Sequence, residues 1–253
     1  MKNVKQKIVI GNWKMNPRTV SEAVDCAKKI ARNLPKKSPT VLLAIPTPFL
    51  KDVHKAVKIK VGMQSITSEQ DGAHTGLSSG PQSMSVGATF SIIGHSEERA
   101  RGNSDEMIAK QVQTACTLKL PFVLCVGEKT RDKDGKYLEI ITNQLKTALA
   151  NIAPRYVSLI TIAYEPVWAI GKDALISATP KECLEVLIAI RRMLSDTFGV
   201  KKANDVPLLY GGSVSKENAA IFVRDGGAQG LLVGRESLKP KNFVDIITEV
   251  GQV

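Results

Sequence analysis

The chain has 253 residues, of which 43% are hydrophobic and 23% charged, a balance typical of globular proteins. Its apolar runs are far shorter than the about 20 residues needed to cross a bilayer, so we expect no membrane-spanning segment. The formal net charge of +11 is spread along the whole chain without aromatic interleaving, which favours a solvated basic surface over a nucleic-acid partner.

The N-terminal residues 1–7 are basic and lead into a short apolar run that ends at Gly11. This segment is too short for a signal peptide and has no small-residue cleavage site, so we expect a cytoplasmic protein.

Apolar runs rich in β-branched residues recur along the chain. They are 8–10, 41–45, 59–63, 90–93, 122–126, 159–163, 206–210 and 230–233. Strands of a parallel sheet that helices cover on both faces are continuously apolar in this way, so each run predicts a buried strand.

Segments with helical periodicity lie between these runs. The predicted helices are 20–34, 51–57, 80–86, 108–115, 141–152, 180–191, 216–224 and 243–250. Thr19 with Glu22 and Thr179 with Glu182 have the spacing of capping boxes, and Pro180 suits a first helical position.

This alternation of strand and helix predicts an α/β protein with a single (β/α)8 barrel, in which eight parallel strands are surrounded by an outer ring of helices. No linker-like composition interrupts the pattern, so we expect one catalytic domain over residues 1–253. An open doubly wound sheet is the alternative, but G-x-G-x-x-G and the P-loop pattern are both absent.

In such a barrel, functional residues lie on the loops that follow the strands. These loops carry Asn12 and Lys14 after the first strand, His95 after the fourth, Glu165 after the sixth, residues 211–213 after the seventh, and Gly234 and Arg235 after the eighth.

Glu165 ends a buried apolar run and precedes Pro166, which should stop the strand there. The loop that follows is unusually apolar through Ile170, as expected of a flap that excludes water from a site. The alternative is that Trp168 packs as an ordinary core residue.

Taken singly, Lys14 fits a surface lysine, His95 a hydrogen-bonded loop residue, and the glycine-rich loops simple tight turns. Around one opening, however, a carboxylate, an imidazole and an ammonium would suit proton abstraction next to a carbonyl. The loops after the seventh and eighth strands would then bind a phosphate.

The four cysteines, Cys26, Cys116, Cys125 and Cys183, form no C-x-x-C pair, which favours reduced thiols. The three histidines are far apart in sequence, so we expect neither a metal site nor a cofactor.

Several motifs occur in the order found in one known family. They are Gly11-Asn12-Trp13-Lys14-Met15-Asn16, Ile93-Gly94-His95-Ser96-Glu97, Cys125-Val126-Gly127-Glu128, Ala163-Tyr164-Glu165-Pro166-Val167-Trp168-Ala169-Ile170-Gly171, Tyr210-Gly211-Gly212-Ser213-Val214 and Leu232-Val233-Gly234. On these motifs the whole chain resembles the triosephosphate isomerase family.

The resemblance implies a cofactor-free enzyme that interconverts dihydroxyacetone phosphate and D-glyceraldehyde 3-phosphate through an enediolate, in glycolysis and gluconeogenesis. Glu165 matches the base, and His95 matches the neutral imidazole that polarises the carbonyl. Lys14 and Asn12 match the residues that stabilise the enediolate oxygen and bind substrate. This family is itself a known instance of such pKa tuning and lid closure.

The same resemblance implies that Gly171, Ser213, Gly234 and Arg235 donate backbone N–H groups to the phosphate. Residues 166–172 match the lid: Pro166, Val167, Trp168, Ala169, Ile170, Gly171 and Lys172. Ser96, Glu97 and Cys125 match the residues that surround and support the catalytic groups.

The resemblance also implies a homodimer in which the loop around Thr75 reaches the neighbour's Asn12 and Lys14. The chain departs from the family at Leu77, Glu98 and Asn103, where a network of charged residues is usual, so we expect apolar contacts and Thr75 to hold the dimer. Arg235 replaces a second glycine, and residues 172–178 form a longer rear hinge than usual.

Two other interpretations remain. Another phosphate-binding barrel enzyme acting on a small sugar phosphate would need a Schiff-base lysine or a metal cluster at other strand ends, and neither is evident. An inactive barrel that binds nucleic acid through its basic surface would be expected to lack Lys14, His95 or Glu165, and all three are present.

Overall fold

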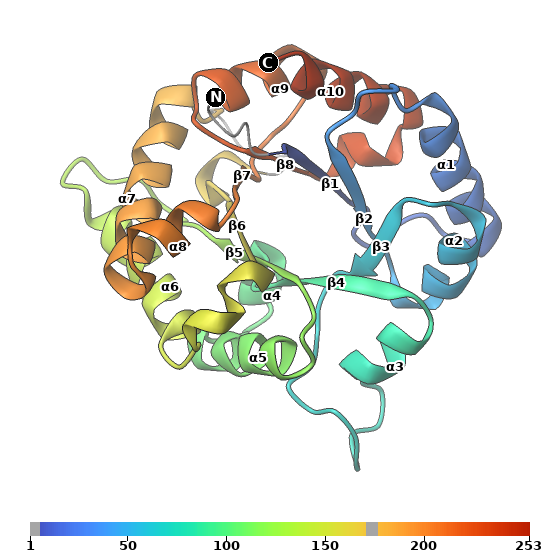
Figure 1. Ribbon diagram of the computed structural model, residues 1–253, viewed down its shortest axis with the longest axis horizontal. Coiled ribbons are helices and arrows are strands. Elements are labelled where there is room, and N and C mark those ends of the chain that lie inside the picture. Colours follow the sequence, from blue (N-terminus) through green and yellow to red (C-terminus); the bar gives the residue numbers. More distant parts are fainter. Residues whose placement is uncertain (1–5, 171–176) are drawn as a thin grey trace.

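In the computed structural model, which describes residues 6–170 and 177–253, eight parallel strands close into a barrel in chain order. Figure 1 looks into this ring of strands, with the helices arranged around it. The strands are β1 (Ile8–Asn12), β2 (Thr40–Ala44), β3 (Lys60–Met63), β4 (Ala88–Ile93), β5 (Phe122–Val126), β6 (Ile160–Tyr164), β7 (Leu208–Tyr210) and β8 (Gly230–Val233). All eight predicted strands are confirmed.

The pairing of β1 closes the ring. Ile8 is in register with Thr40 of β2 on one side and with Gly230 of β8 on the other. An open sheet would have two edge strands with a single neighbour each, whereas each of these eight strands pairs with two neighbours, so the doubly wound alternative is wrong.

The helices are α1 (Val20–Asn33), α2 (Leu50–Ala56), α3 (Gly80–Ser85), α4 (Ser96–Ala100), α5 (Asp105–Thr117), α6 (Lys136–Leu149), α7 (Pro180–Phe198), α8 (Val200–Asp205), α9 (Lys216–Arg224) and α10 (Pro240–Gln252). Both predicted capping boxes form: the Thr19 and Thr179 side chains accept from the N–H groups of Glu22 and Glu182. The short helices α4 and α8 were not predicted.

Two layers of apolar side chains explain why the strands are apolar on both faces. The inner layer fills the barrel and consists of Ile10, Ala44, Phe90, Ile92, Val123, Cys125, Ala163, Leu209 and Leu232. The outer layer packs the strands against the helices, with Ile30, Leu145 and Phe243 among its fully buried members. Burying one such large side chain contributes about 1.5–3 kcal/mol. Because the barrel interior is filled, a substrate site must lie at its rim.

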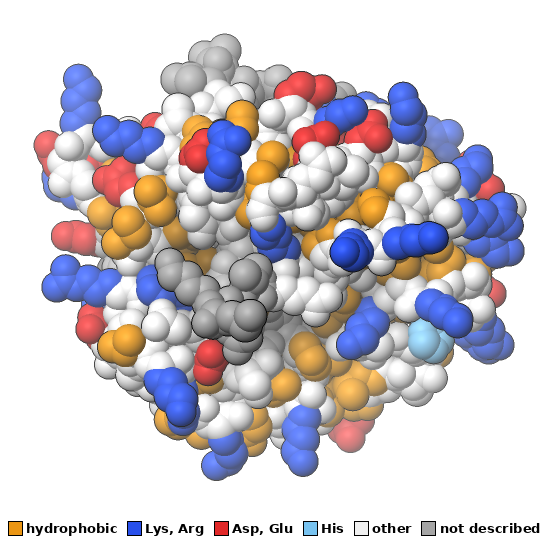
Figure 2. Space-filling view, turned by 45° about the horizontal axis from the view of Figure 1, so that its top comes forward, with side chains coloured by type: hydrophobic (Ala, Val, Ile, Leu, Met, Phe, Trp, Pro, Cys, Tyr) orange, Lys and Arg blue, Asp and Glu red, His pale blue; other side chains and the backbone are white. Residues whose placement is uncertain are grey.

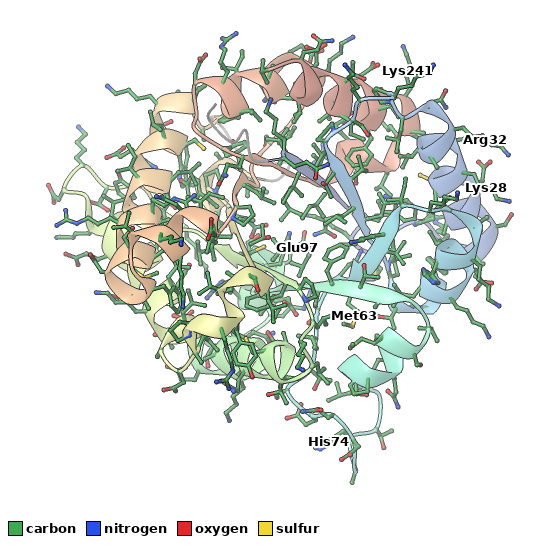
Figure 3. The ribbon with its side chains drawn as sticks, viewed as in Figure 1. Lys28, Arg32, Met63, His74, Glu97 and Lys241 are labelled. Atoms are coloured by element: carbon green, nitrogen blue, oxygen red, sulfur yellow. The ribbon has the colours of Figure 1, made fainter. Side chains whose placement is uncertain are left out.

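The connection from β3 to α3 extends away from the barrel (Figure 1). Residues 71–78 of this connection are exposed, and His74 lies at its tip in Figure 3. Gly72 and Gly76 both have positive φ, at 102° and 91°, which allows the chain to reverse there.

Within the described ranges, no helix combines the length and the apolar character needed to cross a membrane.

Candidate active site

A cavity of about 210 Å³ lies at the ends of several strands. It is lined by Asn12, Lys14, His95, Glu165, Ile170, Gly211, Gly212, Ser213, Val214, Leu232, Gly234, Arg235 and Glu236. The predicted catalytic residues therefore share one small space with the described part of the predicted phosphate loops.

Glu165 directly follows β6, where its backbone N–H continues the sheet by donating to the Val126 carbonyl at 2.8 Å. The residue is only 2% exposed. Its carboxylate accepts from the Ser96 backbone N–H at 2.8 Å and lies 3.1 Å from Nε2 of His95. Two donors therefore fix this buried charge at the cavity wall.

Two glycines leave room for Glu165. A Cβ atom on Gly127 would lie 1.7 Å from the Glu165 carbonyl oxygen, and one on Gly211 would lie 3.1 Å from its Cγ. The first distance is impossible for any side chain, so Gly127 is required for the position of Glu165.

His95 caps the N-terminus of α4. Its Nδ1 accepts a hydrogen bond from the Glu97 backbone N–H at 3.1 Å, and an accepting nitrogen carries no proton. The proton of the ring therefore lies on Nε2, which points to Oε1 of Glu165. The backbone thus holds a neutral imidazole whose N–H faces the site.

Lys14 adopts the left-handed region, with φ of 52°. The Oδ1 atom of Asn12 accepts a hydrogen bond from the Lys14 backbone N–H at 3.0 Å. The Gln64 side chain donates a hydrogen bond to the Lys14 carbonyl at 2.8 Å. Such a backbone is costly for a residue with a Cβ atom, so these contacts stabilise the turn that presents the ammonium. Gln64 was not predicted, although it directly follows β3, much as Lys14 lies two residues after β1.

The ammonium of Lys14 lies 2.6 Å from the Glu97 carboxylate. Glu97 lies in the first turn of α4, which follows β4, and points toward the centre of the ring in Figure 3. Burial alone would raise the pKa of Glu97, but the hydrogen bond and charge of Lys14 hold it below its usual value. This pair links the turn after β1 to α4.

A further layer fixes the turn after β4. Buried Glu98 accepts from the Gly94 N–H at 3.2 Å and from the Ser65 hydroxyl, and burial raises the pKa of its carboxyl. Arg99 donates to the carbonyls of Gly94 at 2.9 Å and Cys125 at 3.3 Å. Neither role was predicted from the sequence.

Cys125 belongs to the inner layer of the barrel and is fully buried. Burial, together with the neighbouring charge of Glu165, raises the pKa of its thiol well above the ordinary value. An un-ionised thiol next to Glu165 is suited to packing and is not poised to act as a nucleophile.

The described part of the predicted lid is 166–170, which contains a short 3-10 helix, η3 (Val167–Ala169). Trp168 donates its Nε1–H to Glu128 at 2.8 Å, and the Tyr164 hydroxyl donates to the same oxygen at 2.9 Å. The Ser213 hydroxyl donates to the Ala169 carbonyl at 3.0 Å. Trp168 thus packs against the core and also ties the predicted lid segment to a buried carboxylate.

Gly171 and Lys172, with most of the predicted rear hinge, lie outside the described residues.

The cavity lining also includes backbone donors. The N–H groups of Ser213, Gly234 and Arg235 donate to no described residue. Arg235 begins the 3-10 helix η4 (Arg235–Leu238) and does not belong to the residues with positive φ, so an arginine fits where a glycine was expected.

Among residues 6–170 and 177–253, no three His, Cys, Asp or Glu side chains gather in a way that could hold a metal ion.

Comparison with known proteins gives one consistent result. The model of the family described as "Triosephosphate isomerase" matches residues 7–250. A triosephosphate isomerase of Caldanaerobacter subterraneus subsp. tengcongensis is 34% identical, covering 96% of this chain and 99% of the relative. That of Thermoanaerobacter pseudethanolicus is 35% identical over the same shares. That of Flavobacterium johnsoniae is 34% identical over 98% of this chain and the whole of the relative.

Proposed function

Since the chain belongs to the triosephosphate isomerase family and interconverts dihydroxyacetone phosphate and D-glyceraldehyde 3-phosphate, a step of glycolysis, we propose that Glu165 is the base of this reaction. The other sugar-phosphate barrel enzymes are favoured by neither the family match nor the relatives.

In the proposed mechanism, the Glu165 carboxylate removes a proton from the carbon next to the substrate carbonyl and returns it to the neighbouring carbon. The contact that supports this role most directly is the 3.1 Å approach between Glu165 and His95 inside the cavity. A substrate oxygen that replaces Glu165 as the acceptor of the His95 Nε2–H would lie beside the carbon that Glu165 must reach.

His95 then polarises the carbonyl and moves protons between the two oxygens, while Lys14 and Asn12 stabilise charge on the enediolate. The fixed Nε2–H supports the first role, because a neutral donor can give up its proton to an oxyanion and recover it. The contact of Lys14 with Glu97 holds the ammonium at the cavity and leaves its remaining donors available.

The phosphate is bound by backbone N–H groups of Gly171, Ser213, Gly234 and Arg235. The unpaired N–H groups of the last three residues support this assignment. Residues 166–172 form the lid, which excludes water because an enediolate phosphate exposed to water eliminates its phosphate.

A coupled isomerase assay tests the role of Glu165. Glu165→Gln keeps the shape of the side chain but removes the base, so we expect kcat to fall by about 10²–10⁴. Glu139→Gln, which changes an exposed carboxylate on α6, is the matched control and should retain activity. Absence of turnover in the wild type, or undiminished turnover in Glu165→Gln, would refute the proposal.

We further propose a homodimer in which the loop around Thr75 enters a second copy. This loop is exposed and projects from the barrel. A hollow of about 150 Å³ lies beside Lys14 and could receive it, bordered by Met15, which is 93% exposed. Leu77, 55% exposed, adds apolar surface. Sedimentation at micromolar concentration that shows only monomer would contradict this proposal.

Glu98 is unavailable for a charged contact between subunits, because it is buried within its own chain. This supports a dimer interface built from Thr75 and apolar contacts, without the charged network that is usual at these positions.

The remaining proposals concern the whole chain: residues 1–253 form one catalytic TIM-barrel domain that acts in the cytoplasm and binds no nucleic acid. Figure 2 supports the last point, since on that face lysines and arginines are scattered among acidic and neutral side chains. Salt-dependent DNA binding in a mobility-shift assay would contradict it.

A further inference from the structure

We propose that the guanidinium of Arg235 is a direct ligand of the substrate phosphate, in addition to the backbone donors. This inference rests on the proposed function, because it concerns the same cavity, and it assigns a side-chain role at a position where glycine was expected.

The position of Arg235 makes this contact available. The residue lines the cavity that contains Glu165, His95 and Lys14. It is exposed, and its side chain forms no hydrogen bond or ion pair with any described residue. A charged group that is uncommitted at the mouth of an active site can bind an anion without first breaking another contact.

Arg235 brings a positive charge to the cavity that is not paired with any described carboxylate. The other cation of the lining, Lys14, is paired with Glu97 at 2.6 Å, and the Glu236 carboxylate is bound by Lys239 at 2.9 Å. A phosphorylated substrate that enters this cavity therefore meets the Arg235 guanidinium as a cation with no ion-pair partner among the described residues.

Glu236, the next residue in the chain, does not neutralise Arg235 by a direct contact. Its carboxylate is bound by Lys239 at 2.9 Å and by Asn242 at 2.6 Å. These hydrogen bonds are the main reason that the pKa of Glu236 lies below its usual value, with a smaller influence from the charge of Arg235. Lys239 and Asn242 therefore hold the carboxylate, and Arg235 has no ion-pair partner among the described residues.

The loop also brings the Arg235 backbone close to the catalytic lysine. A Cβ atom on the preceding residue, Gly234, would lie 3.7 Å from Cε of Lys14. A phosphate bound by the N–H groups of Gly234 and Arg235 would therefore lie near both cations. Guanidinium groups bind phosphate oxygens through paired N–H donors, which an ammonium cannot reproduce.

Steady-state kinetics of Arg235→Gly and Arg235→Lys test this inference. Gly keeps the backbone N–H and removes the side chain, so we expect KM for glyceraldehyde 3-phosphate and Ki for inorganic phosphate to rise roughly threefold to tenfold at low ionic strength. The change in kcat should be smaller than the change in KM, because binding to phosphate is similar in ground and transition states. Lys should give intermediate values.

Two comparisons separate phosphate recognition from other effects. Arg32→Ala removes an equal charge from α1, at the periphery of the molecule in Figure 3, whereas Glu97 lies near its centre, and this variant should match the wild type. The selectivity for glyceraldehyde 3-phosphate over unphosphorylated glyceraldehyde, measured as a ratio of kcat/KM values, should fall in Arg235→Gly. The effect on KM should also diminish as added salt screens the charge.

Wild-type values of KM and Ki in Arg235→Gly would overturn the inference. An equal loss for the phosphorylated and unphosphorylated substrates would also overturn it, because it would indicate a structural role. A wild-type protein without turnover would refute the proposed function instead, and calorimetric titration with inorganic phosphate would then decide the role of Arg235 by the same comparison of variants.

Discussion

Replacing Glu98 by alanine should destabilise the protein through the turn that carries His95. The Glu98 side chain is buried, with 5% exposure of the residue, and accepts from the Gly94 N–H at 3.2 Å. Removing the acceptor leaves that buried N–H unpaired, which costs about 1–3 kcal/mol of the free energy of unfolding. Ser65 is exposed, so its hydroxyl can bond to water and should add little.

Glutamine at the same position separates hydrogen bonding from charge. Its oxygen can accept from Gly94 and its amide can donate to Ser65, so the network should persist. Burial raises the pKa of Glu98, so the folded state holds a proton at pH values where the unfolded state has lost it. The contribution of Glu98 to wild-type stability should therefore fall as pH rises from the unfolded pKa through the folded pKa, and Glu98→Gln should lack this contribution to the pH slope.

Urea denaturation at one protein concentration and several pH values measures both effects, with Glu139→Gln as the exposed control. The reasoning is refuted if Glu98→Ala unfolds with wild-type free energy, or if Glu98→Gln keeps the pH slope of the wild type.

Three further predictions concern other parts of the site. Gly127→Ala should displace Glu165, because the new Cβ would overlap its carbonyl, and kcat should fall about a hundredfold; wild-type kcat would contradict the overlap. Trp168→Phe removes a donor to buried Glu128 and should lower the free energy of unfolding by about 1 kcal/mol in denaturant titrations, a result that an unchanged midpoint would exclude. Thr75→Asp should shift sedimentation toward monomer, and an intact dimer would argue against this interface.

The barrel could be predicted because its strands are buried on both faces, and such strands are continuously apolar. The run at 122–126 coincides with β5, every residue of which is buried. Helices with an apolar stripe and a capping box, such as α1 and α7, were predicted for equally physical reasons.

Helix α4 could not be predicted in the same way. It has five residues, most of them charged, and no apolar period. Its N-cap is His95, which is an unusual residue at this position because Ser, Thr, Asp and Asn are preferred. The helix forms because tertiary contacts of Glu98 and Arg99 fix the preceding turn, and contacts of this kind leave no local pattern in the sequence.

The positions of Asn12, Lys14, His95 and Glu165 followed from the rule that parallel strands end at one rim. The supporting contacts of Gln64 and Arg99 did not, because they join loops that are distant in sequence. A polar residue directly after β3 was the available signal for Gln64.

Because the backbone of Lys14 is left-handed, stability and activity favour different residues at this position. This conformation lowers the free energy of unfolding by roughly 1–2 kcal/mol for a residue with a Cβ atom, and glycine would avoid this cost. Mutation toward glycine would thus make the fold more robust while deleting the ammonium. A screen for heat resistance without an activity filter should enrich Lys14→Gly and yield a stable, inactive barrel.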